Sequence, residues 1–163
     1  MLFRHASELA IRATVFLALQ EPGKLSPVHE IAADSGASEA YLSKILQRLT
    51  GAGLVRSFRG PGKGMELGRP PGEITLAELI HAVEGVQAEQ SCVFGLGRCT
   101  QGTPCALHHE WLPIRSALCE LLEKTTLADL AEAARQDASQ AAGALVSNQD
   151  APVTVSTQGR RQS

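Results

Sequence analysis

The spacing of apolar side chains predicts a mainly helical chain built from short amphipathic segments. Apolar residues recur every three or four positions, which is the period of one face of an α-helix. Glycine and proline separate several of these segments from one another. Helices are expected over residues 3–20, 26–34, 38–50, 76–84, 105–123 and 126–134.

Serine and threonine residues stand where four of these helices are expected to begin. Their hydroxyl oxygens can accept a hydrogen bond from backbone N–H groups that have no partner within the helix. Asp129 follows Thr126 by three residues, which is the spacing of a capping box. The expected caps are Ser26 (followed by Pro27), Ser38, Thr75 and Thr126.

The stretch from residue 54 to residue 67 has the pattern of a β-hairpin. Residues 54–58 and 65–67 favour strands, and the glycine-rich turn 59–64 lies between them. Two short helices joined by the turn Ser35-Gly36-Ala37 precede this hairpin, which is the arrangement of a helix-turn-helix. We therefore expect a winged helix-turn-helix over residues 1–72, with the hairpin as its wing.

The second of these helices and the wing carry side chains suited to DNA. A recognition helix needs polar side chains that reach base edges, and a wing needs cations for the phosphate backbone or the minor groove. Tyr41 suits either a base contact or the core. The expected DNA-binding residues are Ser38, Glu39, Tyr41, Ser43, Lys44, Arg48, Arg59 and Lys63.

Composition changes this picture only through the distribution of charge. The chain has a net charge of −2, but residues 1–70 hold nine Lys and Arg against six Asp and Glu, and residues 71–163 hold six against eleven. A basic first half fits a DNA-facing domain joined to another unit. We expect a cytoplasmic protein without membrane contact, because no apolar stretch reaches the roughly 18 residues of a span and the first residues are too charged for a signal peptide.

Four strings of sequence together resemble a known family of regulators. They are residues 38–49 (SEAYLSKILQRL), 51–55 (GAGLV), 59–64 (RGPGKG) and 74–85 (ITLAELIHAVEG). They are similar to the winged-helix iron–sulfur transcription regulator family typified by IscR and NsrR, over about residues 1–134. The wing departs from the usual pattern at Lys63-Gly64-Met65, where relatives carry a third glycine and an aromatic residue. The resemblance implies a homodimer on a pseudo-palindromic DNA operator.

The helix expected over residues 105–123 is the candidate dimerisation helix. Its apolar stripe is wide and lies outside the winged domain, so another surface has to cover it. A second copy of the chain is the simplest partner, and the resemblance implies that the two copies of this helix cross. Residues 73–135 are thus expected to hold a cluster-binding loop and the dimerisation helix, and residues 136–163 to form a disordered tail.

Three cysteines in a segment without helical periodicity are the candidate cofactor ligands. Cys92, Cys99 and Cys105 follow the pattern C-x6-C-x5-C, with glycines between them that let the backbone approach a metal centre. The spacing is wider than the C-x2-C pairs of structural zinc sites, although a zinc site and a thiol or disulfide switch stay open. Cys119, by contrast, fits a small buried residue of a helix. The resemblance implies an iron–sulfur cluster, either 4Fe-4S or 2Fe-2S.

Three thiolates leave one ligand position open, and two residues are candidates for it. His108 follows Cys105 by three residues on one helix face, an ending that resembles the 2Fe-2S branch of the family. Glu8 matches an acidic residue that, in the 4Fe-4S branch, reaches the cluster from the partner subunit. The ordinary alternatives are a capping or solvent-facing histidine and a surface carboxylate. A nitrogen or oxygen ligand binds iron less firmly than a thiolate does, so a small molecule would attack there.

These features predict a transcription regulator, which we interpret as a repressor, and not an enzyme. A cluster that senses nitric oxide, redox state or iron supply would change the distance between two recognition helices, whose half-sites lie about 34 Å apart. One alternative is a cluster-free winged-helix regulator that uses thiols or a metabolite as its signal. Another is an iron–sulfur electron carrier or enzyme, for which the chain offers neither a nucleotide-binding glycine loop nor a catalytic triad.

Overall fold

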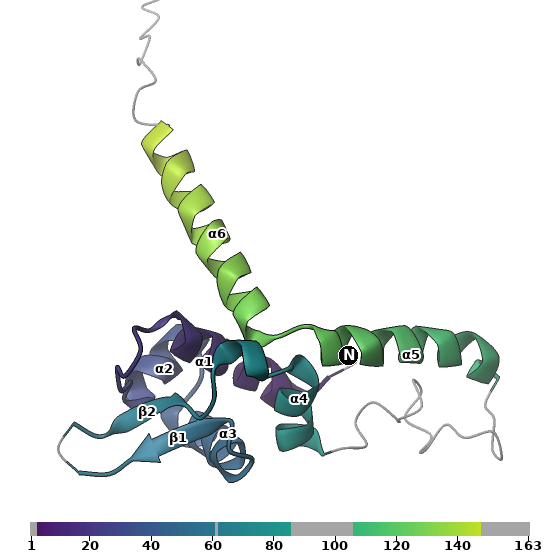
Figure 1. Ribbon diagram of the computed structural model, residues 1–163, viewed down its shortest axis with the longest axis horizontal. Helices are drawn as coiled ribbons and strands as arrows, with labels where there is room; N and C mark the ends of the chain where they lie inside the picture. The colour runs from purple at the N-terminus through teal and green to yellow at the C-terminus, as the bar shows by residue number, and fades with distance from the viewer. Residues whose placement is uncertain (1–2, 61, 86–105, 148–163) are drawn as a thin grey trace, which may run out of the picture.

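The computed structural model describes residues 3–60, 62–85 and 106–147, and this part of the chain is mainly helical (Figure 1). A two-stranded antiparallel sheet pairs Val55 with Leu67 and Phe58 with Gly64. The expected fold class, a mainly α winged helix-turn-helix, is confirmed. The elements in order are α1 (His5–Leu19), α2 (Val28–Ser35), α3 (Glu39–Gly51), β1 (Val55–Phe58), β2 (Gly64–Leu67), the 3-10 turn η1 (Pro71–Glu73), α4 (Leu76–Glu84), α5 (His108–Lys124) and α6 (Leu127–Ser147).

The turn between α2 and α3 is formed as the sequence predicts. Gly36 ends α2 in the left-handed conformation, with φ at 67°, which glycine adopts without steric cost. The Ser38 hydroxyl then caps α3 by accepting a hydrogen bond from the Tyr41 backbone N–H. These two local signals set where α2 ends and where α3 begins.

Ser26 differs from its expected role as the cap of α2. Its backbone N–H and carbonyl oxygen pair with Met65, at 2.9 and 2.8 Å, so Ser26 belongs to a β-bridge with the wing. Pro27 takes the N-cap position instead, and no side chain caps α2. The Ser26 hydroxyl is buried and has no hydrogen-bond partner within the described chain. Ser26 therefore lies one residue before the N-cap, within the bridge to β2, and not at the position from which a side chain caps a helix.

The main core joins the winged helix-turn-helix to the helices that follow it. Leu9 of α1, Leu46 of α3 and Leu79 of α4 are buried in it, and so is Leu127, the first residue of α6. This core therefore includes residues on both sides of position 72. One face of α3 is also fully buried, and its other face is left to solvent. The buried side chains are Leu42, Ile45, Leu46 and Leu49.

Short hydrogen bonds tie the start of α4 to the start of α6. The Leu76 N–H donates to the Thr125 carbonyl oxygen at 3.0 Å, and the Leu127 N–H donates to the Ile74 carbonyl oxygen at 2.8 Å. Both helices begin with the predicted cap, Thr75 with Glu78 and Thr126 with Asp129. α5 extends from this junction as an arm (Figure 1), and its last turns pack against α4, where Leu122 forms a small core with Ala77 and Ile80.

Hydrogen bonds at these two caps favour the charged form of both carboxyl groups. Burial alone would raise the pKa of Glu78, but the Thr75 backbone N–H and the Arg69 guanidinium outweigh it and lower that pKa. The Thr126 hydroxyl and backbone N–H lower the pKa of Asp129. Both carboxylates therefore act as caps in their ionised form, next to the positive ends of the helix dipoles.

The bounds of the last two helices differ from the expected ones. α5 begins at His108, three residues later than predicted, because residues 106 and 107 form a turn. α6 continues to Ser147 instead of ending near Ala134, so the first part of the expected disordered tail is helical. The extension is rich in alanine, which has the highest helix propensity of all residues.

The Gly68 position generates a prediction about stability. A Cβ at this residue would collide with the Gly53 carbonyl oxygen, which belongs to the backbone and cannot move aside cheaply. We expect Gly68→Ala to lower the free energy of unfolding by about 1–3 kcal/mol in urea denaturation. Gly72→Ala is the matched control, because no heavy atom lies within 4 Å of its Cβ. Equal stability of the two variants would contradict the packing described.

Candidate nucleic-acid interface

The solvent face of α3 holds most of the residues predicted to read DNA. Ser38, Glu39 and Lys44 are exposed, and Ser43 is half-buried. Tyr41 is 41% exposed, so it is not part of the core; its ring stacks on His5 with the centroids 6.3 Å apart. The first two turns of α3 therefore present hydroxyl groups, a carboxylate, an ammonium and an aromatic ring to solvent.

The wing places two exposed cations next to this face. Arg59 and Lys63 lie in the turn between β1 and β2, where the Lys63 N–H donates to the Gly60 carbonyl oxygen at 3.0 Å. Gly60 has φ at 102°, a conformation that side-chain-bearing residues rarely adopt. A third cation of the hairpin, Arg56, instead forms an ion pair with Glu66 across the strands at 2.7 Å.

A hollow of about 440 Å³ lies between the wing and the helix-turn-helix. Glu39 of α3 and His29 of α2 line it from one side, and Phe58 lines it from the wing. His29 and Phe58 were not predicted as site residues, since nothing in a helix or strand pattern marks them until the hairpin folds over the start of α2. The hollow is lined by Pro27, Val28, His29, Glu39, Ser57, Phe58, Arg59, Gly60, Lys63, Gly64 and Met65.

Arg48 is placed differently from the other predicted DNA-binding residues. Its guanidinium group donates from Nη1 to the Val83 carbonyl oxygen at 2.8 Å, across 35 positions of sequence. This contact joins the last turn of α3 to the last turn of α4. Lys44, one turn earlier on α3, takes part in no such contact within the described chain.

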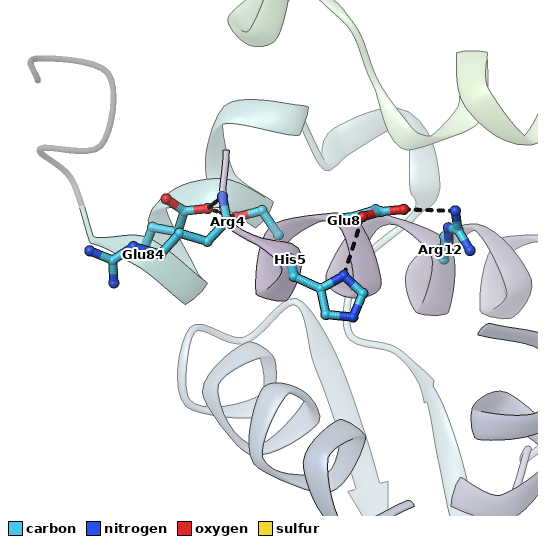
Figure 2. Close-up of polar contacts among 6 residues, drawn as sticks. Arg4, His5, Glu8, Arg12 and Glu84 are labelled. Atoms are coloured by element: carbon cyan, nitrogen blue, oxygen red, sulfur yellow. Dashed lines mark hydrogen bonds and ion pairs between the residues drawn. The ribbon is translucent and has the colours of Figure 1, made fainter. Parts of the chain in front are cut away.

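Glu8, a candidate cluster ligand, lies in a row of polar side chains along α1 (Figure 2). Its carboxylate accepts a hydrogen bond from Arg12 at 2.7 Å and lies 3.3 Å from Nδ1 of His5. The Glu8 side chain remains 48% exposed. The carboxylate is therefore oriented by two neighbours while its surface stays reachable from outside the subunit.

His108, the other candidate ligand, is buried at the start of α5. It is 3% exposed, and its ring lies edge-on to that of His109, with the centroids 5.5 Å apart. His108 is therefore not a solvent-facing histidine. The predicted ligands Cys92, Cys99 and Cys105 lie outside the described residues. Within residues 3–60, 62–85 and 106–147, no three His, Cys, Asp or Glu side chains gather around a possible metal position.

Comparison with known sequences identifies relatives that cover most of the chain. Residues 3–133 match the family model described as Rrf2, iron-dependent transcriptional regulator. An HTH-type transcriptional regulator of Mycobacterium tuberculosis is 37% identical over 126 residues, which are 77% of this chain and 78% of the relative. The regulator IscR of Cronobacter sakazakii is 35% identical over 121 residues, 74% of each chain. These relatives are regulators and not enzymes, as the sequence predicts.

Solved structures give the same assignment of fold. CymR, described as the global cysteine regulator of B. subtilis, has a TM-score of 0.68 and 31% identity, over 80% of this chain and 95% of that one. IscR of T. potens has a TM-score of 0.63 and 25% identity, over 80% and 86%. Separately, none of the helices in the described part of the chain combines the length and apolar character needed to cross a bilayer.

The exposed wing cations generate a prediction about DNA affinity. Lys63→Ala should weaken binding to any duplex and reduce the slope of log K against log salt concentration by about 0.9, because one phosphate contact releases about one counterion. The slope is measured by fluorescence anisotropy at several salt concentrations. Lys124→Ala removes the same charge from the end of α5 and should leave the slope unchanged. An unaltered slope in Lys63→Ala would remove the wing tip from the interface.

Proposed function

We propose that this chain, which belongs to the Rrf2 family of transcriptional regulators, binds a pseudo-palindromic operator as a homodimer and adjusts its affinity through an iron–sulfur cluster. The family assignment and the winged fold make the chain a DNA-binding transcriptional regulator. The cysteine triplet between α4 and α5 is the observation that carries the sensing part of the proposal. It occurs in a chain that matches an iron-dependent family over residues 3–133.

For DNA, the exposed turns of α3 suit the major groove and the wing suits the backbone or the minor groove. Ser38, Glu39, Tyr41, Ser43 and Lys44 belong to the first two turns of α3 or cap them. Polar and aromatic side chains there can contact base edges, whereas Arg59 and Lys63 contribute positive charge. The hollow between α3 and the wing is lined by Glu39 of α3 and by both wing cations.

The surface of α5 supports a homodimer. Leu107, Ile114 and Leu121 are 43, 58 and 60% exposed and recur every seven residues. Trp111 and Leu118 complete an alternating spacing of four and three residues, and both are half-buried. This is the a/d repeat of two helices that pack side by side. A second copy of α5 fits this stripe, because it would present the same repeat.

The stripe generates a prediction about oligomeric state. Ile114→Glu should shift the protein from dimer to monomer in analytical ultracentrifugation, because a carboxylate at the centre of the stripe would be buried without a partner. Ser116→Glu introduces the same charge about half a helical turn away and should leave the dimer intact. If Ile114→Glu sediments as the unmodified protein does, α5 is not the interface.

The residues around the proposed cluster fit an iron–sulfur group. Cys92, Cys99 and Cys105 supply thiolates, the ligands that such clusters require. The half-exposed carboxylate of Glu8 is accessible to a partner subunit, and the buried ring of His108 follows the last cysteine by three residues. Both remain candidates for the fourth ligand. A bound cluster supplies iron that reacts with nitric oxide or oxygen, which is the chemistry of a sensor.

Glu8 as a ligand would connect the cysteine segment (residues 92–105) of one subunit to the DNA-binding unit of the other. α1, which carries Glu8, packs against α3 in the main core. Arg12 and His5 orient the Glu8 carboxylate along α1. Loss of the cluster would remove this connection between the two subunits.

A second candidate is a cluster-free regulator that responds through thiols or a metabolite. The likeness to CymR supports it, since that protein is described as a global cysteine regulator. Both candidates share the winged domain, the wing cations and the α5 stripe. They differ only in what the cysteine segment binds.

Anaerobic native mass spectrometry of the full-length protein separates these candidates and names the fourth ligand. We expect the mass of a dimer with iron and sulfide bound to each subunit, and the added mass distinguishes 2Fe-2S from 4Fe-4S. Of Glu8→Ala and His108→Ala, the variant that loses the added mass identifies the ligand, while Glu132→Ala, an exposed carboxylate of α6, serves as the control. Protein from iron-replete, oxygen-free cells that shows only the polypeptide mass would favour the cluster-free regulator.

A further inference from the structure

The last turn of α4 receives hydrogen bonds from two other helices. The Arg48 guanidinium of α3 donates to the Val83 carbonyl oxygen at 2.8 Å. At the next residue, the Glu84 carboxylate accepts from the Arg4 backbone N–H at 2.7 Å (Figure 2). It also accepts from the Ser7 hydroxyl. Two consecutive residues of α4 thus hold the end of α3 and the start of α1.

Both contacts satisfy groups that a helix leaves without partners. The last four carbonyl groups of a helix lack intrahelical donors, and the Val83 carbonyl is one of these in α4. The first N–H groups of α1 lack acceptors, and the Arg4 side chain does not cap them. Glu84 supplies a negative charge at that positive helix end. Hydrogen bonds that involve a charged group are about twice as strong as neutral ones, so both contacts are strong as well as directional.

Apolar packing sets which face of α3 is buried, but it leaves small rotations and tilts of the helix to other contacts. Leu42, Ile45, Leu46 and Leu49 bury one face of the helix, but contacts between aliphatic side chains have little directional preference. The Arg48 hydrogen bond is directional and lies near the end of α3, beyond the DNA-facing turns. It therefore limits the rotation and tilt that the buried face leaves available.

We propose that Arg48 is a positioning residue of the DNA interface: it holds the orientation of α3 relative to Val83 and Glu84, and it is not a phosphate contact. One guanidinium nitrogen, Nη1, is committed to a carbonyl oxygen of its own chain. The orientation of Ser38, Tyr41 and Lys44 toward base edges then depends on the last turn of α4. A displacement of that turn would be transmitted to α3 through Arg48.

The test compares binding to specific and non-specific DNA in full-length protein. Arg48→Ala should weaken binding to a sequence selected from random DNA by about tenfold, as the loss of a charge-assisted hydrogen bond allows. Binding to a scrambled duplex should change by less than about twofold, and the salt slope for either duplex should stay unchanged. Arg48→Lys, which retains a donor, should recover most of the specific affinity.

Lys44→Ala is the matched variant, since Lys44 is a cation one turn earlier on the same helix. It should weaken both duplexes and lower the salt slope by about 0.9. The proposal is overturned if Arg48→Ala behaves like Lys44→Ala, or if it leaves both affinities unchanged. Thermal unfolding checks that each variant is folded.

Glu84→Ala provides a second test if Arg48→Ala does not fold. It frees the same turn of α4 from α1 without removing a cation from α3. We expect a loss of specific affinity that exceeds the loss of non-specific affinity. Unchanged discrimination between the two duplexes in Glu84→Ala would contradict a role for this turn in orienting α3.

Discussion

The buried face of α3 is the constraint on which the rest of the structure depends. Leu42, Ile45, Leu46 and Leu49 are at most 2% exposed, and each contributes about 1.5–3 kcal/mol by leaving water. They contact apolar side chains of α1, α2 and α4 in one core. A polar face for DNA can stay exposed on α3 only because the opposite face is held in this way.

Hydrogen bonds add a directional restraint that the burial of apolar side chains does not supply. Arg48 and Glu84 fasten α3 and the start of α1 to the same turn of α4, while the caps at Thr75 and Thr126 hold the starts of α4 and α6 together. Cys92, the first cysteine of the triplet, follows Glu84 by eight positions in the sequence. In the proposed regulator, a change in the cysteine segment would therefore act at the point where α3 is fastened.

Local signals account for the parts of the fold that the sequence predicts correctly. Gly36, and the hydroxyl groups of Ser38 and Thr75, act within four residues of themselves, so the sequence alone indicates helix ends and caps. The prediction that Ser26 caps α2 was wrong because a non-local contact decides its position. Its backbone pairs with Met65, 39 positions away, and no local pattern reveals that bridge. The contact of Arg48 with Val83 and the stacking of His5 on Tyr41 are likewise non-local. Helical periodicity places Arg48 on the polar face of α3 and does not say which partner it finds there.

The most direct test of this account is to measure the distance between the two copies of α3 in the DNA-free dimer. Gln47, an exposed residue of α3, is replaced by a ketone-bearing amino acid, and a nitroxide label is attached to the ketone. This chemistry leaves the native cysteines unmodified. Double electron–electron resonance should give a narrow distance distribution in the otherwise native protein and a broader or displaced one in Arg48→Ala. The same narrow distribution in both proteins would contradict the claim that the last turn of α4 sets the orientation of α3.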